Sequence, residues 1–414
     1  MKSQALFSVI SGSLLLAGQA YAQDYTSVSI DVSCPAATAP AACPAGLGPG
    51  QVATQTSARG INARGDIVGF YVAGGRQRGF LLKDGKYTSL EFPVPAVVST
   101  IANGINPRGE IVGAYTVPVH DPANPPPADS PLYCPSAGNA ACNKSFHYWR
   151  GNFSTVMFPT TVDENGQERK HPGATVQRIT PEGDIYGCLH DHDTGMSMFG
   201  AAWTLSGAFS LLSNGGLLSD SMAVPMSMNN GATPGERPTI VGFYSDMSSL
   251  SLQHGYVIRD GMFEQYDATS IPADPAKTLP LTAIWDINPS GQFVGTYRET
   301  GEASTKRHGF VQNPGEARPV TLDFICRDLA GCAGAPPGTA AFATIAFGIN
   351  PDGVIVGQYA LISGGPAHGF IAVPSASGEK TSGALTGVPR GQELSLVLNK
   401  RPPDLLALLF KKEP

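Results

Sequence analysis

The sequence predicts an all-β protein, a six-bladed β-propeller with four-stranded blades that is closed by an N-terminal strand completing the last blade. One observation is a repeated phrase: GINARGDIVGFY, GINPRGEIVGAY and GINPDGVIVGQY begin at Gly60, Gly104 and Gly348. Another is composition, because 49 glycines and 35 prolines with only 14% charged residues favour turns and strands over helices. Repeats of about 40 to 75 residues with four strands each are typical of propeller blades.

The first 22 residues have the features of a secretory signal peptide. Lys2 supplies the positive region, an apolar run follows, and Ala20-Tyr21-Ala22 is a small-x-small cleavage site. The apolar run is too short to span a membrane, and no later segment approaches about 20 apolar residues. We therefore expect a secreted or periplasmic protein with no membrane span, in which residues 23–374 form the propeller.

Each repeat carries the signals of four antiparallel strands in the same order. An apolar stretch ends in Ile-Asn, and a turn such as Asn-Pro-x-Gly at 106–109 leads into a strand of the type IVGFYV. A variable loop precedes a third strand beginning with His-Gly-Phe or a related triplet, and a tight turn such as 83–86 leads to a fourth strand. We number the repeats 1 to 6 by the residue at the Asn position, in order Asn62, Asn106, Thr180, Asn229, Asn288 and Asn350.

The sixth repeat has signals for only three strands and ends with HGFIAVP at 368–374. The segment YTSVSIDV at 25–32 resembles the fourth strand of other repeats, such as KYTSLEF. We therefore expect the N-terminal strand to complete the last blade and leave no open sheet edge. An open solenoid is the alternative, since it would not need this strand.

The sequence of the repeats resembles that of the bacterial extracellular repeat family called HAF, named after a His-Ala-Phe signature. The residues that carry the resemblance are the GINxxGxIVGxY phrases and the His-Gly-Phe triplets, between about residues 55 and 374. Gly replaces the Ala of the family's signature. The resemblance implies an exported, propeller-like protein and little specific biochemistry.

The alternation of strand direction divides the connections between two faces of the ring. The first-to-second and third-to-fourth turns are short and lie on one face, the turn face. The second-to-third loops and the connections between repeats are long and variable, and they lie on the other, the loop face. Variable loops on a rigid scaffold often carry function, so we expect the binding face there.

Three close cysteine pairs also fall in the long loops: Cys34/Cys43, Cys134/Cys142 and Cys326/Cys332. In an exported protein this spacing predicts local disulfides, with reduced thiols as the alternative. Cys188 is left over in a strand-like segment, IYGCL, and is expected to be a small buried side chain.

Two sets of residues are candidates for ligand binding. His254, His308 and His368 begin the third strand of their repeats, and Arg78 and Lys144 hold the same position in repeats 1 and 2. Such a ring of polar or cationic groups could bind an anionic ligand, and the simpler interpretation is a hydrogen bond to a neighbouring loop. The second set departs from the small or apolar residues of the innermost strand and consists of Arg59, Gln177, Trp285 and Asp286.

The stretch His190-Asp191-His192-Asp193 is the most distinctive feature outside the repeats. In an extended backbone His190 and His192 point the same way. They are candidate ligands of a transition metal, or a catalytic acid/base pair oriented by Asp191 and Asp193. A solvated polar loop is the alternative, and the sequence identifies no cofactor.

Charge excludes one class of partner. The mature chain has 26 Lys and Arg (27 less Lys2) against 33 Asp and Glu, a net charge of −7, whereas nucleic-acid binding needs a basic surface. Contiguous nucleophile, zinc-protease and nucleotide motifs are absent. The sequence therefore predicts a monomer that binds an extracellular glycan or protein on its loop face. The alternatives are a lyase or hydrolase of an extracellular polymer or ester, and an envelope protein that uses the polar linker and short tail at 375–414.

Overall fold

A computed structural model describes residues 25–375 apart from 128–129, 135–140, 157–160, 163–167, 170–172, 192–196, 205–208, 212–221, 230–238, 247–248, 261, 327–331 and 333–334. The fold is all-β, as predicted, and the described part contains one short 3-10 turn at Pro40–Ala42 besides its strands. No helix in these ranges is long and apolar enough to cross a membrane.

Repeats 1 and 2 form one eight-stranded sheet that consists of two four-stranded units. Repeat 1 contains β2 (Gln55–Ile61), β3 (Ile67–Ala73), β4 (Arg76–Lys83) and β5 (Lys86–Leu90). Repeat 2 contains β6 (Ser99–Ile105), β7 (Ile111–Pro118), β8 (Ala141–Trp149) and β9 (Asn152–Val156). All pairs within a unit are antiparallel, and the units are joined by a single parallel pair, Gln77 with Ser99.

Repeat 3 forms its own four-stranded sheet, and repeats 4 and 5 form a second eight-stranded one. Repeat 3 contains β12 (Gly173–Ile179), β13 (Asp184–Asp191), β14 (Ser197–Thr204) and β15 (Phe209–Leu211). Repeat 4 contains β16 (Met222–Met228), β17 (Ile240–Asp246), β18 (Ser249–Arg259) and β19 (Met262–Tyr266). Repeat 5 contains β20 (Leu281–Ile287), β21 (Phe293–Arg298), β22 (His308–Gln312) and β23 (Val320–Thr321). A small hairpin, β10 (Thr161–Val162) with β11 (Glu168–Arg169), lies between repeats 2 and 3 in the chain.

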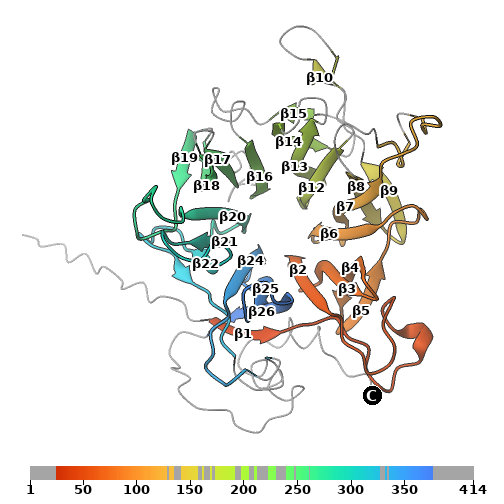
Figure 1. Ribbon diagram of the computed structural model, residues 1–414, viewed down its shortest axis with the longest axis horizontal. Helices are drawn as coiled ribbons and strands as arrows, with labels where there is room; N and C mark the ends of the chain where they lie inside the picture. Colours follow the sequence, from red (N-terminus) through yellow and green to blue (C-terminus); the bar gives the residue numbers. More distant parts are fainter. Residues whose placement is uncertain are drawn as a thin grey trace, which may run out of the picture.

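The N-terminal strand joins the last repeat, as the sequence predicts. Repeat 6 contains β24 (Ala343–Ile349), β25 (Ile355–Ala360) and β26 (His368–Pro374), and β1 (Tyr25–Ser29) is the fourth strand of this sheet. The pairing is antiparallel, from Tyr25 opposite Pro374 to Ser29 opposite Phe370. The units surround a central axis with β2, β6, β12, β16, β20 and β24 innermost (Figure 1).

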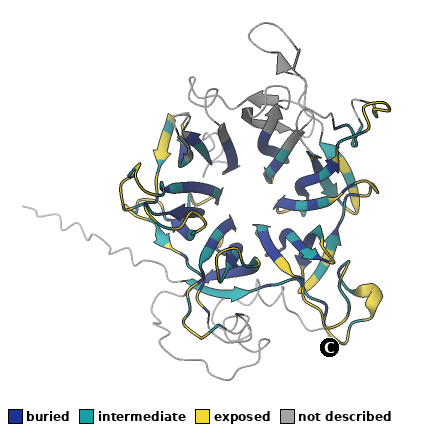
Figure 2. Cartoon of the chain, in the orientation of Figure 1, coloured by how far each residue is buried: buried dark blue, intermediate teal, exposed yellow. Residues whose placement is uncertain are grey.

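The buried core lies between neighbouring sheets. The Tyr that ends the repeated IVGxY phrase and the aromatic residue of the His-Gly-Phe triplet supply the largest fully buried side chains, among them Tyr71, Phe80, Tyr359 and Phe370. Side chains of repeat 1 such as Ile67 pack in one cluster with Val356 of repeat 6. Buried residues therefore follow the inner strands, and exposed residues follow the outer strands and loops (Figure 2).

Glycine in the second strand is required by a β-bulge in the first. In every inner strand the register shifts by one residue, as between Ala58 and Gly60, three residues before the Asn position. The bulge brings a carbonyl oxygen of the inner strand over the second-strand glycine, so that an added Cβ would lie 2.0–2.2 Å from it. These glycines are Gly69, Gly113, Gly187, Gly242, Gly295 and Gly357. The third residue of the repeated IVG triplet is thus fixed by the conformation of its neighbouring strand.

The repeated Asn has two structural tasks. In repeat 1 the side-chain oxygen of Asn62 accepts bonds from the backbone of its own turn, at Arg64 and Asp66. Its amide donates to the backbone oxygen of Asn106 in the next repeat, at 3.2 Å. The same link, at 3.1–3.5 Å, runs from Asn106 to Thr180, Asn229 to Asn288, Asn288 to Asn350, and Asn350 back to Asn62. The Asn residues therefore join neighbouring repeats near the axis.

The three predicted disulfides are confirmed. Cys34 bonds to Cys43, Cys134 to Cys142, and Cys326 to Cys332. Each closes a short loop on the loop face. Cys188 is buried, as expected, and burial raises the pKa of its thiol to about 12, which makes it a poor nucleophile.

Candidate functional site

The six bulged residues of the inner strands differ from repeat to repeat. They are Arg59, Asn103, Gln177, Met226, Trp285 and Phe347, six different residue types at one structural position. Asn103, Met226 and Phe347 are buried, whereas Arg59, Gln177 and Trp285 remain partly exposed. These three are the inner-strand residues that sequence analysis selected together with Asp286.

The bulged side chains contact one another across repeats. The Arg59 guanidinium lies 4.0 Å from the ring centroid of Phe347, a cation–π contact between repeats 1 and 6. Trp285 packs against the same Phe347 ring in an edge-on arrangement at 4.9 Å. Burial, and then the charge of Arg178, lower the pKa of Arg59 to about 10, so Arg59 stays charged at neutral pH. The structure thus brings Arg59 and Trp285 to one aromatic ring.

Arg178 and Asp286 form an ion pair across the axis, with Nε 3.4 Å from Oδ1. Arg178 donates to the carbonyl oxygen of Asn103 at 2.7 Å, to that of Arg59 at 3.1 Å and to that of Phe347. The two residues therefore connect repeats 1, 2, 3, 5 and 6.

Asp286 is fully engaged by the chain itself. Its carboxylate accepts from the Ser227 hydroxyl at 2.5 Å in repeat 4 and from the Ile349 amide at 3.0 Å in repeat 6. Its own oxygens are thus committed to neighbouring repeats, which supports a structural role for this predicted ligand-binding residue.

A cavity of about 150 Å³ opens beside this pair on the turn face. Its wall consists of the Ile-Asn ends of inner strands and the prolines that follow them, such as Ile105, Asn106 and Pro107. Arg178 and Asp286 line it, but the six bulged residues do not. The ion pair therefore separates the turn-face cavity from the bulged side chains.

The predicted ring of His and Arg residues lies in four separate ion pairs, each within one sheet. Arg78 meets Glu91 at 2.9 Å, His254 meets Asp267 at 2.9 Å, His308 meets Asp323 at 2.7 Å and His368 meets Asp31 at 2.8 Å. Each acid directly follows the fourth strand of the same unit or lies two residues beyond it. This arrangement matches the simpler interpretation, a bond to the neighbouring segment.

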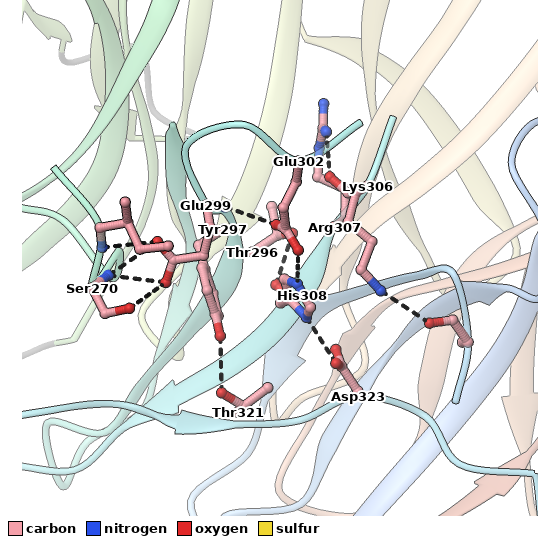
Figure 3. A network of polar contacts seen from close by, with 12 residues as sticks. Ser270, Thr296, Tyr297, Glu299, Glu302, Lys306, Arg307, His308, Thr321 and Asp323 are labelled. Atoms are coloured by element: carbon pink, nitrogen blue, oxygen red, sulfur yellow. Dashed lines mark hydrogen bonds and ion pairs between the residues drawn. The ribbon is translucent and has the colours of Figure 1, made fainter. Parts of the chain in front are cut away.

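His308 is held from both sides (Figure 3). Its Nδ1 meets Asp323, and its Nε2 lies 3.0 Å from Glu302 in the loop between β21 and β22. The bond to Asp323, and then that to Glu302, raises the pKa of His308 against the opposing effect of burial. The bond to Asp31 raises the pKa of His368 in the same way. These pairs fix the loop face to the rigid strands.

Catalysis and metal binding at the His-Asp-His-Asp stretch stay predictions. The backbone of His190 and Asp191 forms the end of β13, opposite Gly173, Met198 and Ser197. The side chains of His190 and Asp191, and the whole of His192 and Asp193, lie outside the described residues. Among the residues that are described, no cluster of three or more His, Cys, Asp or Glu side chains fits a metal ion.

Sequence reasoning missed two structural features around the candidate site. Arg178 was overlooked although its position is glycine in repeats 1, 2 and 6, at Gly60, Gly104 and Gly348. The acids were also overlooked, although an acidic residue recurs between apolar ones in IDV, LEF, YDA and LDF of the fourth strands. Both signals were available from aligning the repeats position by position.

Comparison with known proteins gives a distant structural likeness only. No family model matches the sequence, and no curated protein matches it. The structure is similar to the α-L-arabinanase of Penicillium chrysogenum at 9% identity and a TM-score of 0.41, with 84% of this chain and 98% of that chain covered. It is similar to the Trypanosoma rangeli sialidase at 9% identity and a TM-score of 0.45, covering 85% and 59%. The GH74 xyloglucanase of Xanthomonas campestris follows at 12% and 0.38, covering 84% and 55%. No activity or ligand transfers to this chain at these values.

Proposed function

We propose that the protein is an exported, closed six-bladed propeller that binds an extracellular glycan at the axis, on the loop-face side of the Arg178–Asp286 pair. The observation that carries the proposal is the variation at the bulge. The second-strand glycine opposite the bulge is kept in all six repeats because the sheets need it, whereas the bulge itself has a different side chain in every repeat. A position that the scaffold does not constrain is free to be chosen for a ligand.

The three partly exposed bulged residues suit a sugar. Trp285 offers a broad, partly exposed apolar ring, whereas its indole N–H is buried and has no acceptor among the described residues. The Arg59 guanidinium is a charged donor held over Phe347, and its Nε donates to the Ser57 hydroxyl at 3.0 Å. Gln177 adds an amide that can both donate and accept. Ring stacking with a few directed hydrogen bonds is how small polar ligands are held.

Export and closure belong to the same proposal. Disulfides persist in oxidising compartments, and this protein has three disulfides that close loops on the loop face. The pairing of β1 with β26 and the Asn350–Asn62 contact support closure between repeats 6 and 1. Membership of the HAF-repeat family is also proposed. An experimental structure with five or seven repeats would show that one degenerate repeat had been misread.

Titration of the mature protein with neutral and uronate-containing oligosaccharides tests the binding site, by calorimetry and by tryptophan fluorescence. Trp285→Ala and Gln177→Ala should each weaken the affinity about tenfold or more, because each removes a direct contact. Trp149→Ala is the matched control, since Trp149 ends β8 and packs against Arg150 away from the inner strands. Binding that survives both axial substitutions, or that fails equally in the control, would exclude the axial site.

The hydrolase or lyase alternative has a separate test. Metal content of protein purified without chelator would be measured beside a His190→Ala/His192→Ala variant. About one transition metal per chain that is lost in the variant would favour the catalytic function.

A further inference from the structure

Isoleucines from five repeats line the turn-face cavity, and all of them keep a small exposed surface. They are 4–8% exposed, whereas Ile67 and Ile111 at the start of second strands are completely buried. The five are Ile61, Ile105, Ile179, Ile287 and Ile349. Four lining prolines are exposed and form the rim of the cavity: Pro107, Pro181, Pro289 and Pro351. A hollow with such a wall favours an apolar occupant.

The volume and the floor of the cavity favour an aromatic ring. The cavity measures about 150 Å³, and an apolar protein cavity of about 150 Å³ is large enough to bind benzene. Its floor is the Arg178–Asp286 pair. A guanidinium is attracted to the face of an aromatic ring, whereas an aliphatic side chain offers it no such contact. A phenylalanine side chain therefore suits this cavity better than a leucine.

The chain leaves the propeller beside this cavity. β26 begins on the loop face and ends at Pro374 on the turn face, where a Cβ added to Gly353 would lie 3.4 Å from the Pro374 ring. Gly353 closes the turn that carries the rim residue Pro351. The innermost strand of this sheet is two strands away, about 10 Å at the usual spacing. A flexible chain of about 35 residues spans about 30 Å, so the residues that follow Ser375 can reach the rim.

The segment 376–414 has one aromatic residue and an excess of positive charge. Phe410 ends the apolar run LLALLF at 405–410, and Lys411 and Lys412 follow it. The segment has 6 Lys and Arg against 4 Asp and Glu, a net charge of +2. The rest of the chain has 21 Lys and Arg (27 less 6) against 29 Asp and Glu (33 less 4), a net charge of −8. The segment and the propeller therefore attract each other.

Two carboxylates lie at the cavity and make no ion pair within the described part of the chain. Asp352 follows the rim residue Pro351, and Asp184 precedes the lining residue Tyr186 by two positions. The long first-to-second turn of repeat 4 is the competing occupant from the same face. Its residues 230–238, which lie outside the described ranges, include no aromatic and no large aliphatic residue. Size, reach and charge therefore all favour Phe410.

We propose that residues 405–412 of this chain dock on the turn face, with the Phe410 ring in the cavity beside Arg178. The two lysines that follow Phe410 then lie near the two carboxylates at the cavity. Docked in this way, the segment covers the apolar rim and closes the turn-face end of the axis. The connection through residues 376–404 makes the contact intramolecular, at an effective concentration in the millimolar range. This contact is independent of the proposed function, because it lies on the other side of the ion pair and needs no glycan.

Disulfide formation between engineered cysteines tests the docking in the mature protein. Glu413→Cys is combined in turn with Pro107→Cys and with Pro289→Cys, which place a thiol on the rim in repeats 2 and 5. Met262→Cys is the matched control, since Met262 begins β19 after a turn of the same face and is 71% exposed outside the cavity. After mild oxidation, peptide mass spectrometry should show a link to at least one rim position about tenfold faster than to position 262. Equal rates, or a link that joins two molecules, would overturn docking of the segment on its own chain.

Substitutions within the segment test whether Phe410 is the anchor. In the faster rim pair, Phe410→Ala should slow the link about tenfold, and Lys411→Glu/Lys412→Glu should slow it about threefold. Leu396→Ala is the control, because Leu396 lies in the same segment outside the apolar run. An unchanged rate in Phe410→Ala, or an equal loss in Leu396→Ala, would refute the anchoring role of Phe410.

Benzene gives an independent readout of the cavity. It should raise the melting temperature of Phe410→Ala, in which the cavity is vacated, and leave that of the parent protein unchanged. An equal response of the two proteins, or no response in either, would refute the occupation of the cavity by the Phe410 ring.

Discussion

The Arg178–Asp286 pair should contribute more to stability than any other polar contact near the axis. Both side chains are 11% exposed, and between them they bond to all of the other repeats. Arg178→Met leaves the Asp286 carboxylate buried without its cation, and breaking a buried pair from one side typically costs about 3–5 kcal/mol. The variant also removes the donor to the Asn103 and Arg59 carbonyl oxygens. We therefore expect a loss of about 4 kcal/mol.

Asp286→Asn should cost less, about 2 kcal/mol, because Arg178 keeps its bonds to backbone oxygens. The double variant removes both charges, so its loss should be smaller than the sum of the two single losses by about 2 kcal/mol. Urea unfolding followed by tryptophan fluorescence and circular dichroism measures all three variants against the parent protein.

The control for this cycle is Lys277→Met, which removes an ion pair to Asp274 in which both side chains are exposed. That change should cost about 1 kcal/mol or less. Additive effects of Arg178→Met and Asp286→Asn, within about 0.5 kcal/mol, would refute the coupling across the axis. Single losses below about 1 kcal/mol would refute the claim that the pair is buried and engaged.

Three further predictions concern the repeat. Gly113→Ala should destabilise the fold by about 3 kcal/mol, since the added Cβ would lie 2.0 Å from the Ile101 oxygen. Gly48→Ala is the control, because its Cβ would meet only ordinary contacts. Equal urea midpoints for the two variants would contradict this prediction. Thr180→Asn should raise stability by about 1 kcal/mol by supplying the missing amide link toward Asn229, and a lower melting temperature would contradict the linking role of Asn. The stability that His308 and His368 contribute should be fully present below about pH 6.5 and be lost as pH rises through their raised pKa values, because folding favours their protonated forms. Melting temperatures from pH 6 to 9 should flatten in the His308→Gln/His368→Gln variant.

Much of the fold could be predicted because the same strand and turn signals occur in several repeats. The turn after Asn106, the cysteine pairs and the partner of the N-terminal strand all follow from local signals or from comparing repeats. The β-bulge could not be predicted, because a one-residue shift in register leaves no characteristic residue at the bulge. The bulge instead requires a glycine in the neighbouring strand, such as Gly113. That requirement becomes clear only when the pairing of the two strands is known.

The candidate site was predicted in part, for a physical reason. Arg59, Gln177 and Trp285 were noticed because they depart from the small or apolar residues of an inner strand. Asp286 was noticed for the same reason, but its carboxylate is bonded to Ser227 and Ile349. A residue that departs from the repeat can therefore mark a structural contact between repeats as well as a binding residue. Side-chain contacts between repeats were needed to tell the two apart.

That asymmetry connects the scaffold with the proposed axial site. In repeats 1, 2 and 6 the residue after the bulge is glycine, and an added Cβ would lie 2.9–3.1 Å from the neighbouring carbonyl oxygen, so these backbones touch directly. In repeats 3, 4 and 5 the same position is Arg178, Ser227 and Asp286, which bridge the axis through side chains. Gln177 and Trp285 directly precede Arg178 and Asp286 in the chain. Repeats 3, 4 and 5, which are held together by these polar side chains, therefore carry two of the three partly exposed bulged residues. Each of the two is anchored through its neighbour in the chain. A rigid anchor one residue away is what keeps a binding side chain oriented before its ligand arrives.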